Sequence, residues 1–196
     1  MKKIICLSGL LLILFSCKKA SISLLKNSNG VPPTQFAKYT IRQGQNHCDN
    51  NNFVATSYSE LNFIAKFDST AIYSNVIPVN QLDINKLYGF ADNNSTHQQF
   101  SARFGWRWSD NALRLFAYVY NDGIRSSKEL GIVSIGAENN CGIKINSKSY
   151  VFLLNGKVDS LPRTSTTTKA IGYKLYPYFG GDETAPHNIY IWIKEL

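Results

Sequence analysis

The chain has 196 residues, with 21 Lys or Arg against 13 Asp or Glu, which gives a formal net charge of +8 at pH 7. This length suits one domain with a sizeable hydrophobic core. The basic residues are scattered along the chain rather than gathered in a polybasic tract, so the sequence argues against a nucleic-acid partner.

The first residues carry the parts of a bacterial export signal. Lys2 and Lys3 precede an almost uninterrupted apolar run over residues 4–15. A helix needs about 20 residues to cross the hydrocarbon core of a membrane, so this shorter run does not suit a transmembrane segment. The sequence therefore predicts a signal peptide that is removed from the mature protein.

The end of this run, Leu14-Phe15-Ser16-Cys17, resembles the lipobox of bacterial lipoproteins, with a bulkier residue than usual at Phe15. The resemblance implies that residues 1–16 are cleaved off and that Cys17 becomes a lipid-anchored N-terminus. Lys18-Lys19 follows, rather than an inner-membrane Asp signal, so the resemblance implies the outer membrane of the cell envelope, with its periplasmic and surface faces both open. The alternative is an ordinary secretory signal with a chance cysteine.

Residues 17–35 have the composition of a flexible tether. The segments Asn27-Ser28-Asn29-Gly30 and Pro32-Pro33 cannot continue a helix or a central strand. We expect this tether to hold a single folded domain, residues 36–196, away from the membrane.

Two cysteines, Cys48 and Cys141, remain in the exported chain besides Cys17. A disulfide between them would close a long loop and stabilise the fold by about 4 kcal/mol, and two free buried thiols are the alternative. His47 beside Cys48 has no second ligand pair at zinc spacing, so the sequence predicts no metal site and no cofactor.

From residue 36 onward, short alternating segments are separated by Asn, Asp, Gly and Ser. Residues 61–67 alternate with period two, and an Asn155-Gly156 turn follows the apolar residues 150–154. Residues 56–66 are the one helix contender, although their Phe-rich alternation favours strand. The pattern predicts an all-β, antiparallel β-sandwich of the jelly-roll kind.

Residues 100–120 form the clearest predicted hairpin. If Trp108 pairs with Leu113, the apolar positions of both strands face the core together. Those positions are Phe100, Ala102, Phe104, Trp106, Trp108, Leu113, Leu115, Ala117 and Val119.

The opposite face of this hairpin combines arginines with aromatic rings. The same register sets Arg107 opposite Arg114, Gly105 opposite Phe116, Arg103 opposite Tyr118, and Ser101 opposite Tyr120. Aromatic rings can stack on sugars while Arg binds a carboxylate or sulfate, so Arg103, Arg107, Arg114, Phe116, Tyr118 and Tyr120 are candidate ligands of an acidic carbohydrate. The alternative is a structural face, with Arg103 stacked on Tyr118 and nearby acids neutralising the other arginines.

A second candidate cluster precedes the C-terminus. Lys174, Tyr176 and Tyr178 would share one face of a strand as far as Pro177 lets it continue. A tyrosine with a nearby histidine and arginine can abstract a proton from a uronate while its carboxylate is neutralised, which is polysaccharide lyase chemistry.

The strand pattern and these two clusters resemble the concanavalin A-like jelly rolls, which include binding domains and alginate-lyase-type enzymes. The catalytic strands of those lyases have only faint counterparts at His97-Gln98-Gln99-Phe100 and Tyr176-Pro177-Tyr178-Phe179-Gly180, so no catalytic residue is assigned. The first expectation is a non-catalytic, glycan-binding or surface-interaction lipoprotein. The alternatives are a small polysaccharide lyase acting on uronic-acid polymers and a structural envelope lipoprotein without a small ligand.

Overall fold

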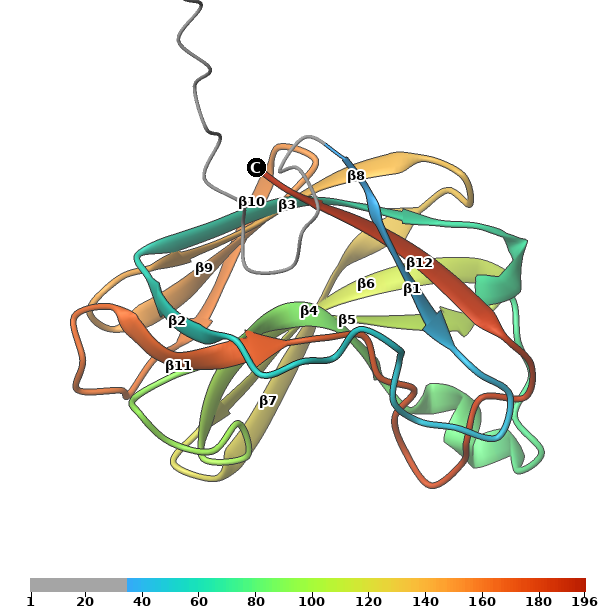
Figure 1. Cartoon of the computed structure of the whole chain (residues 1–196), viewed down its shortest axis with the longest axis horizontal. Coiled ribbons are helices and arrows are strands. Elements are labelled where there is room, and N and C mark those ends of the chain that lie inside the picture. The colour runs from blue at the N-terminus through green and yellow to red at the C-terminus, as the bar shows by residue number, and fades with distance from the viewer. Residues whose placement is uncertain (1–34) are drawn as a thin grey trace, which may run out of the picture.

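The computed structural model describes residues 35–196. The expected signal peptide, Cys17 and all but the last residue of the expected tether lie outside the described residues. The described chain forms two antiparallel six-stranded sheets stacked face to face (Figure 1), which confirms the predicted all-β sandwich. No helix within residues 35–196 is both long and apolar enough to cross a membrane.

The two sheets exchange strands along the sequence, as in a jelly roll. In spatial order, sheet A contains β1 (Ala37–Ile41), β12 (Ile189–Glu195), β3 (Glu60–Phe67), β8 (Glu138–Ile145), β9 (Ser149–Leu154) and β10 (Lys157–Pro162). Sheet B contains β2 (Ala55–Tyr58), β11 (Ala170–Leu175), β4 (Asn85–Ala91), β5 (Phe100–Ser109), β6 (Ala112–Asn121) and β7 (Ile124–Val133). Two short 3-10 helices, η1 (Ser69–Ala71) and η2 (Pro78–Leu82), lie between β3 and β4.

Two-residue turns fix the hairpins of both sheets. Asp110 and Asn111 join β5 to β6 with φ of 52° and 55°, and Asn155 and Gly156 join β9 to β10 with φ of 49° and 86°. Positive φ at both central positions gives the turn a twist that matches the twist of the flanking strands. The Asn155-Gly156 hairpin is therefore confirmed. The helix contender at residues 56–66 instead forms most of two strands, β2 and β3.

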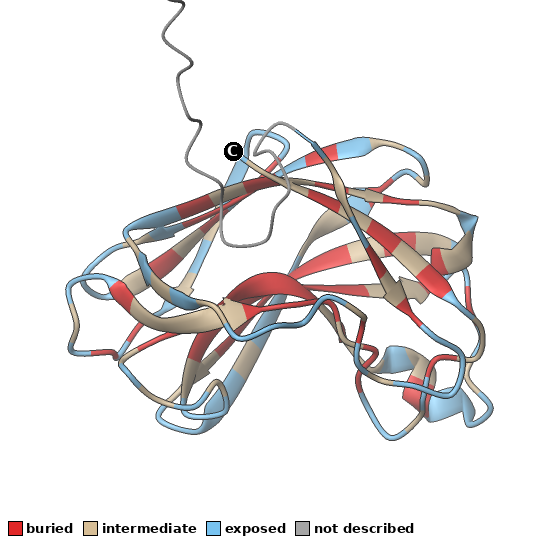
Figure 2. Cartoon of the chain, in the orientation of Figure 1, coloured by how far each residue is buried: buried red, intermediate tan, exposed pale blue. Residues whose placement is uncertain are grey.

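The core lies between the sheets, where the alternation places it (Figure 2). Trp108 pairs with Leu113 as predicted, and this register carries through the whole of β5 and β6. Phe104 and Trp106 are fully buried, as are Phe63 and Phe67 on β3 of the other sheet. Edge-to-face contact between Phe63 and Phe104, with ring centroids 5.5 Å apart, joins the two layers.

A close approach between β4 and β5 shapes the outer face of sheet B. The register of these strands shifts between Lys86 and Gly89. A Cβ atom at Gly89 would lie 2.2 Å from the Ala102 carbonyl oxygen and 2.5 Å from the Arg103 Cα. Only glycine fits there without a shift of the backbone, so Gly89 lets β4 lie directly against Arg103 of β5.

Cys48 and Cys141 are both buried free thiols, so the candidate disulfide does not form and the alternative prediction holds. Burial raises the pKa of the Cys48 thiol to about 12, and burial also raises the pKa of Cys141. Both side chains belong to the hydrophobic core, where a thiol packs as a small apolar group.

Candidate functional site: a cationic cleft on sheet B

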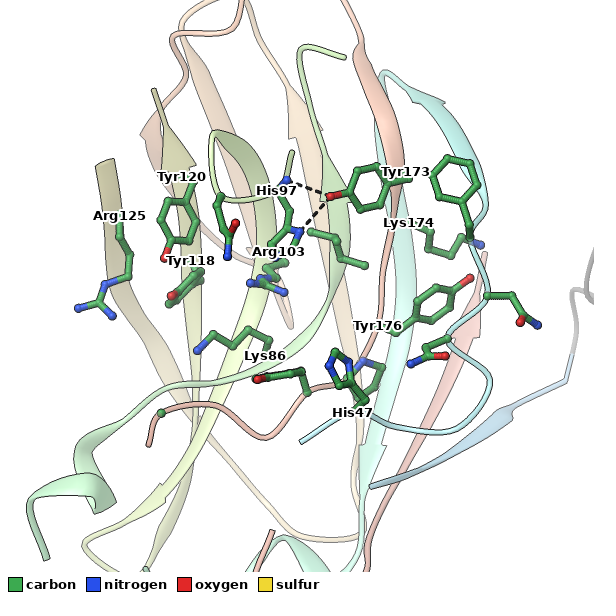
Figure 3. Close-up of a pocket in the computed structure, with 18 residues that line it drawn as sticks. His47, Lys86, His97, Arg103, Tyr118, Tyr120, Arg125, Tyr173, Lys174 and Tyr176 are labelled. Atoms are coloured by element: carbon green, nitrogen blue, oxygen red, sulfur yellow. Dashed lines mark hydrogen bonds between the residues drawn. The ribbon is translucent and has the colours of Figure 1, made fainter. Parts of the chain in front are cut away.

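A cleft of about 710 Å³ lies on sheet B, between the outer faces of β4 to β7 and the segments around residues 47–53 and 173–181 (Figure 3). Its volume is within the usual range of ligand pockets. The lining residues are His47, Asn51, Asn52, Phe53, Lys86, His97, Gln98, Arg103, Tyr118, Tyr120, Arg125, Tyr173, Lys174, Leu175, Tyr176, Pro177, Tyr178 and Gly181.

Three cations from three strands meet around one ring of this cleft. Lys86 of β4 lies with its Nζ 5.1 Å from the centroid of the Tyr118 ring, and the Arg103 guanidinium of β5 lies 5.5 Å from the same centroid. Arg125 of β7 pairs in register with Tyr120, whose ring lies 5.9 Å from that of Tyr118. None of the described residues that line the cleft is Asp or Glu, so this part of the surface is strongly electropositive.

Arg103 is the most unusual of these cations, because its side chain is buried without a carboxylate. The residue is only 8% exposed, and its Nε atom is buried with no hydrogen-bond partner. Burial lowers the pKa of Arg103 to about 10, while the tyrosines around it act in the opposite direction. A buried cation whose hydrogen-bonding capacity is unused is costly, which makes Arg103 suited to an anion that enters the cleft.

Lys86 owes its position to the segment that follows β11. Its backbone N–H donates to the Tyr178 carbonyl over 2.8 Å, and the Tyr178 N–H donates back to the Lys86 carbonyl over 2.9 Å. Burial, with Arg103 and Arg125 nearby, lowers the pKa of Lys86 to about 8, and Asp83 opposes this shift. At neutral pH the amine is mostly protonated, with a minor fraction neutral.

The other end of the cleft is aromatic. The Tyr173 hydroxyl accepts a hydrogen bond from the His97 backbone N–H over 3.0 Å and lies 2.9 Å from His97 Nδ1. Phe53 lies beside Tyr173, with ring centroids 5.6 Å apart. Burial and the nearby Arg103 lower the pKa of His97, which favours the neutral imidazole.

His47 borders the cleft on the side of Tyr178. Their rings meet edge to face, with centroids 4.8 Å apart, and an isolated β-bridge joins their backbones. Within residues 35–196 there is no group of three or more His, Cys, Asp or Glu side chains placed to hold a metal ion.

The predicted Arg–aromatic face divides into two parts. The register is as predicted, with Arg107 opposite Arg114 and Arg103 opposite Tyr118. Of the six candidate ligands on this face, the structure brings Arg103, Tyr118 and Tyr120 into the cleft lining and leaves Arg107, Arg114 and Phe116 outside it.

The structural alternative applies to Arg107 and Arg114, whose guanidinium groups already have partners in the structure. Arg114 forms ion pairs with Asp110 over 3.2 Å and with Glu129 over 3.0 Å. Arg107 lies 4.9 Å from the centroid of the Phe116 ring and donates from NH1 to the Leu82 carbonyl over 2.6 Å. The acids neutralise Arg114, and the ring and the carbonyl occupy Arg107. This is the structural role that the alternative prediction gave to these arginines.

The predicted C-terminal cluster also borders the cleft, but its side chains do not act together. Lys174 forms an ion pair with Glu195 over 2.6 Å. Tyr176 is buried, with its ring 5.9 Å from Tyr88 and 5.9 Å from Tyr39 in the core. In Figure 3, Lys174 and Tyr176 lie at the opposite side of the cleft from Arg125. β11 ends at Leu175, so Tyr178 follows on a separate segment rather than on one continuous strand face.

Sequence reasoning did not identify Lys86, Arg125 or Phe53 as site residues. The position of Arg125 could have been predicted from the sequence, because Asp122-Gly123 is a typical two-residue turn. Both of its residues have positive φ, and the turn sets Arg125 opposite Tyr120. Lys86 and Phe53 carry no comparable local signal, since their place in the cleft depends on segments distant in the chain.

No protein-family model matches this sequence, and no curated protein matches it. Several solved structures, however, match its fold. The chain is similar to alginate lyase vAL-1 from Chlorella virus, with a TM-score of 0.51, 13% identity, and coverage of 82% of either chain. It is also similar to a Bacteroides ovatus glycoside hydrolase family 16 enzyme in complex with a glucan product (TM-score 0.55, 9% identity, 82% of this chain and 81% of that one).

A third similar structure is alginate lyase AlyC3, with a TM-score of 0.53, 9% identity, and coverage of 82% of this chain and 74% of that one. At such low identity the likeness concerns the fold. It confirms the predicted concanavalin A-like sandwich, a fold shared by polysaccharide lyases and glycoside hydrolases.

Proposed function

We propose that this concanavalin A-like sandwich binds an acidic polysaccharide in the cleft of sheet B. The observation that carries the proposal is Arg103, a buried guanidinium with an unpartnered Nε. It shares the cleft with Lys86 and Arg125, and none of the lining residues that the structure describes is a carboxylate. A uronate carboxylate or a sulfate would supply the missing acceptor, since Arg binds such groups through paired, charge-assisted hydrogen bonds.

The aromatic lining supports a carbohydrate rather than a small inorganic anion. Tyr120, Tyr173 and Tyr178 are partly exposed and border the cations. A tyrosine ring presents an apolar face to the C–H groups of a sugar and a hydroxyl to its oxygens. Glycoside hydrolysis of the two-carboxylate kind is not favoured, because no acidic pair lies among the cleft residues that the structure describes.

The proposal is tested by titrating the purified protein with acidic and neutral polymers. We expect alginate or polygalacturonate to bind and the neutral glucan laminarin to bind much more weakly. Affinity for the acidic polymer should fall as salt rises, because the contacts are ionic. Equal affinity for acidic and neutral polymers, or none for any acidic polymer, would refute the proposal.

A second candidate function is polysaccharide lyase activity, and the lowered pKa of Lys86 favours it. A neutral Lys86 amine could take the proton from C5 of a uronate whose carboxylate Arg103 neutralises. The C4–O bond then breaks, a C4–C5 double bond forms, and the ammonium returns the proton to the departing oxygen. The reaction is balanced without any other reactant.

The lyase proposal is tested by following the ultraviolet absorbance of the unsaturated uronate product. We expect the wild-type protein to generate this product from an acidic polymer. Lys86→Arg should lose turnover while it still binds, because its guanidinium keeps the charge but stays protonated and cannot accept the C5 proton. Binding by the wild-type protein without any unsaturated product would leave the binding function and reject the lyase.

We also propose that the protein is a lipoprotein anchored in the outer membrane through Cys17. The support is the lipobox-like spacing of Leu14, Ser16 and Cys17. The described chain enters the fold through β1 of sheet A, whereas the cleft lies on sheet B, so an anchored domain could keep its cleft open to solvent. Fatty-acid labelling that persists in Cys17→Ala would reject the anchor.

A further inference from the structure

The Phe53–Tyr173 pair differs in character from the rest of the cleft. Phe53 is 76% exposed, although transfer of a phenylalanine side chain out of water is favourable. It lines the cleft at the end that holds His97 and Tyr173. An exposed aromatic ring inside a ligand cleft is a surface that a ligand can cover.

The structure holds this pair in place before any ligand binds. The Lys174 backbone N–H donates to the Val54 carbonyl over 2.9 Å, which fixes the chain next to Phe53 against β11. The contacts of the Tyr173 hydroxyl with His97 hold the second ring. The two rings pack against each other with centroids 5.6 Å apart and a tilt of 34°, so together they form one apolar platform. A pre-organised platform loses little side-chain entropy on binding.

We propose that Phe53 and Tyr173 form an apolar subsite that stacks on a sugar ring adjacent to the residue whose acid group binds at Arg103. The inference rests on the proposed acidic-polysaccharide function and specifies it further. The ligand is then an oligosaccharide of at least two residues, and the sugar over Phe53 offers an unobstructed C–H face. A single uronate would occupy the cationic end and leave this platform uncovered.

The test is an NMR titration of the full-length protein with galacturonic acid and with oligogalacturonates of increasing length, repeated with the matching mannuronate series. In the wild-type protein, affinity should rise when the chain becomes long enough to reach Phe53. Phe53→Ala should remove that gain, which lowers the affinity for the longer oligosaccharides by about tenfold, and should leave the affinity for the monomer unchanged. Phe53→Trp should keep the gain, because it retains a ring.

Ile124→Ala is the matched control, because Ile124 is 70% exposed on β7 and does not line the cleft. It should bind every length as the wild type does. If Phe53→Ala keeps the length-dependent gain, or weakens monomer and oligomer equally, the subsite is refuted while the binding function stands. If Phe53→Ala dissociates a dimer in sedimentation, Phe53 serves self-association and the subsite is likewise refuted. Absence of binding to any uronate would refute the proposed function itself.

Discussion

Arg163 and Arg103 are both buried arginines of this sandwich, 4% and 8% exposed, but their surroundings are opposite. The Arg163 Nε donates to Asp92 over 2.8 Å, and its NH2 group reaches the other Asp92 oxygen and the Ser165 hydroxyl. The Arg103 Nε has no partner, and the contact of its guanidinium is with the Tyr118 ring. A buried arginine that serves the fold is surrounded by acceptors, so the missing acceptor at Arg103 indicates a place for a ligand.

The same contrast recurs along the outer face of sheet B. Arg114, at the turn end of β6, is paired with Asp110 and Glu129. Arg103, farther from that turn on the neighbouring strand, lies near Lys86, His97 and several tyrosines, with no carboxylate among the described residues of the cleft lining. Residue type alone does not separate the two arginines. The acids within reach of each one do.

The largest expected effect is on stability at the Arg163 site. Asp92→Ala leaves Arg163 buried and unpaired and should lower the free energy of unfolding by about 3–5 kcal/mol. The measurement is urea denaturation in the absence of ligand. Arg103→Met is the matched control and should unfold at the same or higher urea concentration, because it removes a buried charge without an ionic partner. Equal destabilisation by the two variants would contradict the contrast.

The next effect is on binding. Arg103→Met should weaken the affinity for polygalacturonate by about ten- to a hundredfold, because a charge-assisted hydrogen bond contributes about 1.5–3 kcal/mol. Calorimetric titration measures the loss. Arg114→Met should bind as the wild type does, since its guanidinium is already paired outside the cleft. A binding defect confined to Arg114→Met would reverse the assignment of the two arginines.

Lys86 should make binding and stability depend on pH in opposite directions. Affinity for an acidic polymer should fall as pH rises through about 8, because the ammonium loses its charge. Stability of the free protein should instead rise between about 8 and 10.5, because over that range the unfolded state binds more protons than the folded one.

Lys86→Met should flatten both of these pH profiles. Titrations with polygalacturonate and urea denaturation across the pH range measure them. A free protein whose stability stays level between about pH 8 and 10.5 and falls above 10.5, with the fall removed in Lys86→Met, would show that Lys86 is paired with an acid rather than buried among cations.

The smallest expected effect concerns the surface ion pairs of Arg114. Its partners are 77% (Asp110) and 37% (Glu129) exposed, so Arg114→Ala should cost only about 0.5–1 kcal/mol of unfolding free energy. The loss should shrink as salt is added. Thermal denaturation at low and high ionic strength measures it, and a salt-independent loss would point to packing of the side chain instead.

Alternation in the sequence predicted several strands, at residues 61–67, 100–120 and 150–154, and the register of the central hairpin. Alternation along β5 and β6 requires Trp108 to pair with Leu113, because a shift of one residue would expose every apolar side chain of a strand. The Asn155-Gly156 turn was equally readable, since few residue pairs accept positive φ at both positions. These features depend on neighbours in the chain.

Only the tertiary structure decided which polar residues form the cleft. Lys86 lies there because residues 177–178 return to pair with it, and Phe53 lies there because Val54 bonds to β11. Whether an arginine is neutralised depends on acids such as Glu129 that arrive from another strand. Neighbours that lie far apart in the chain leave no periodic signal in the sequence, so the site forms only when the sheets have folded.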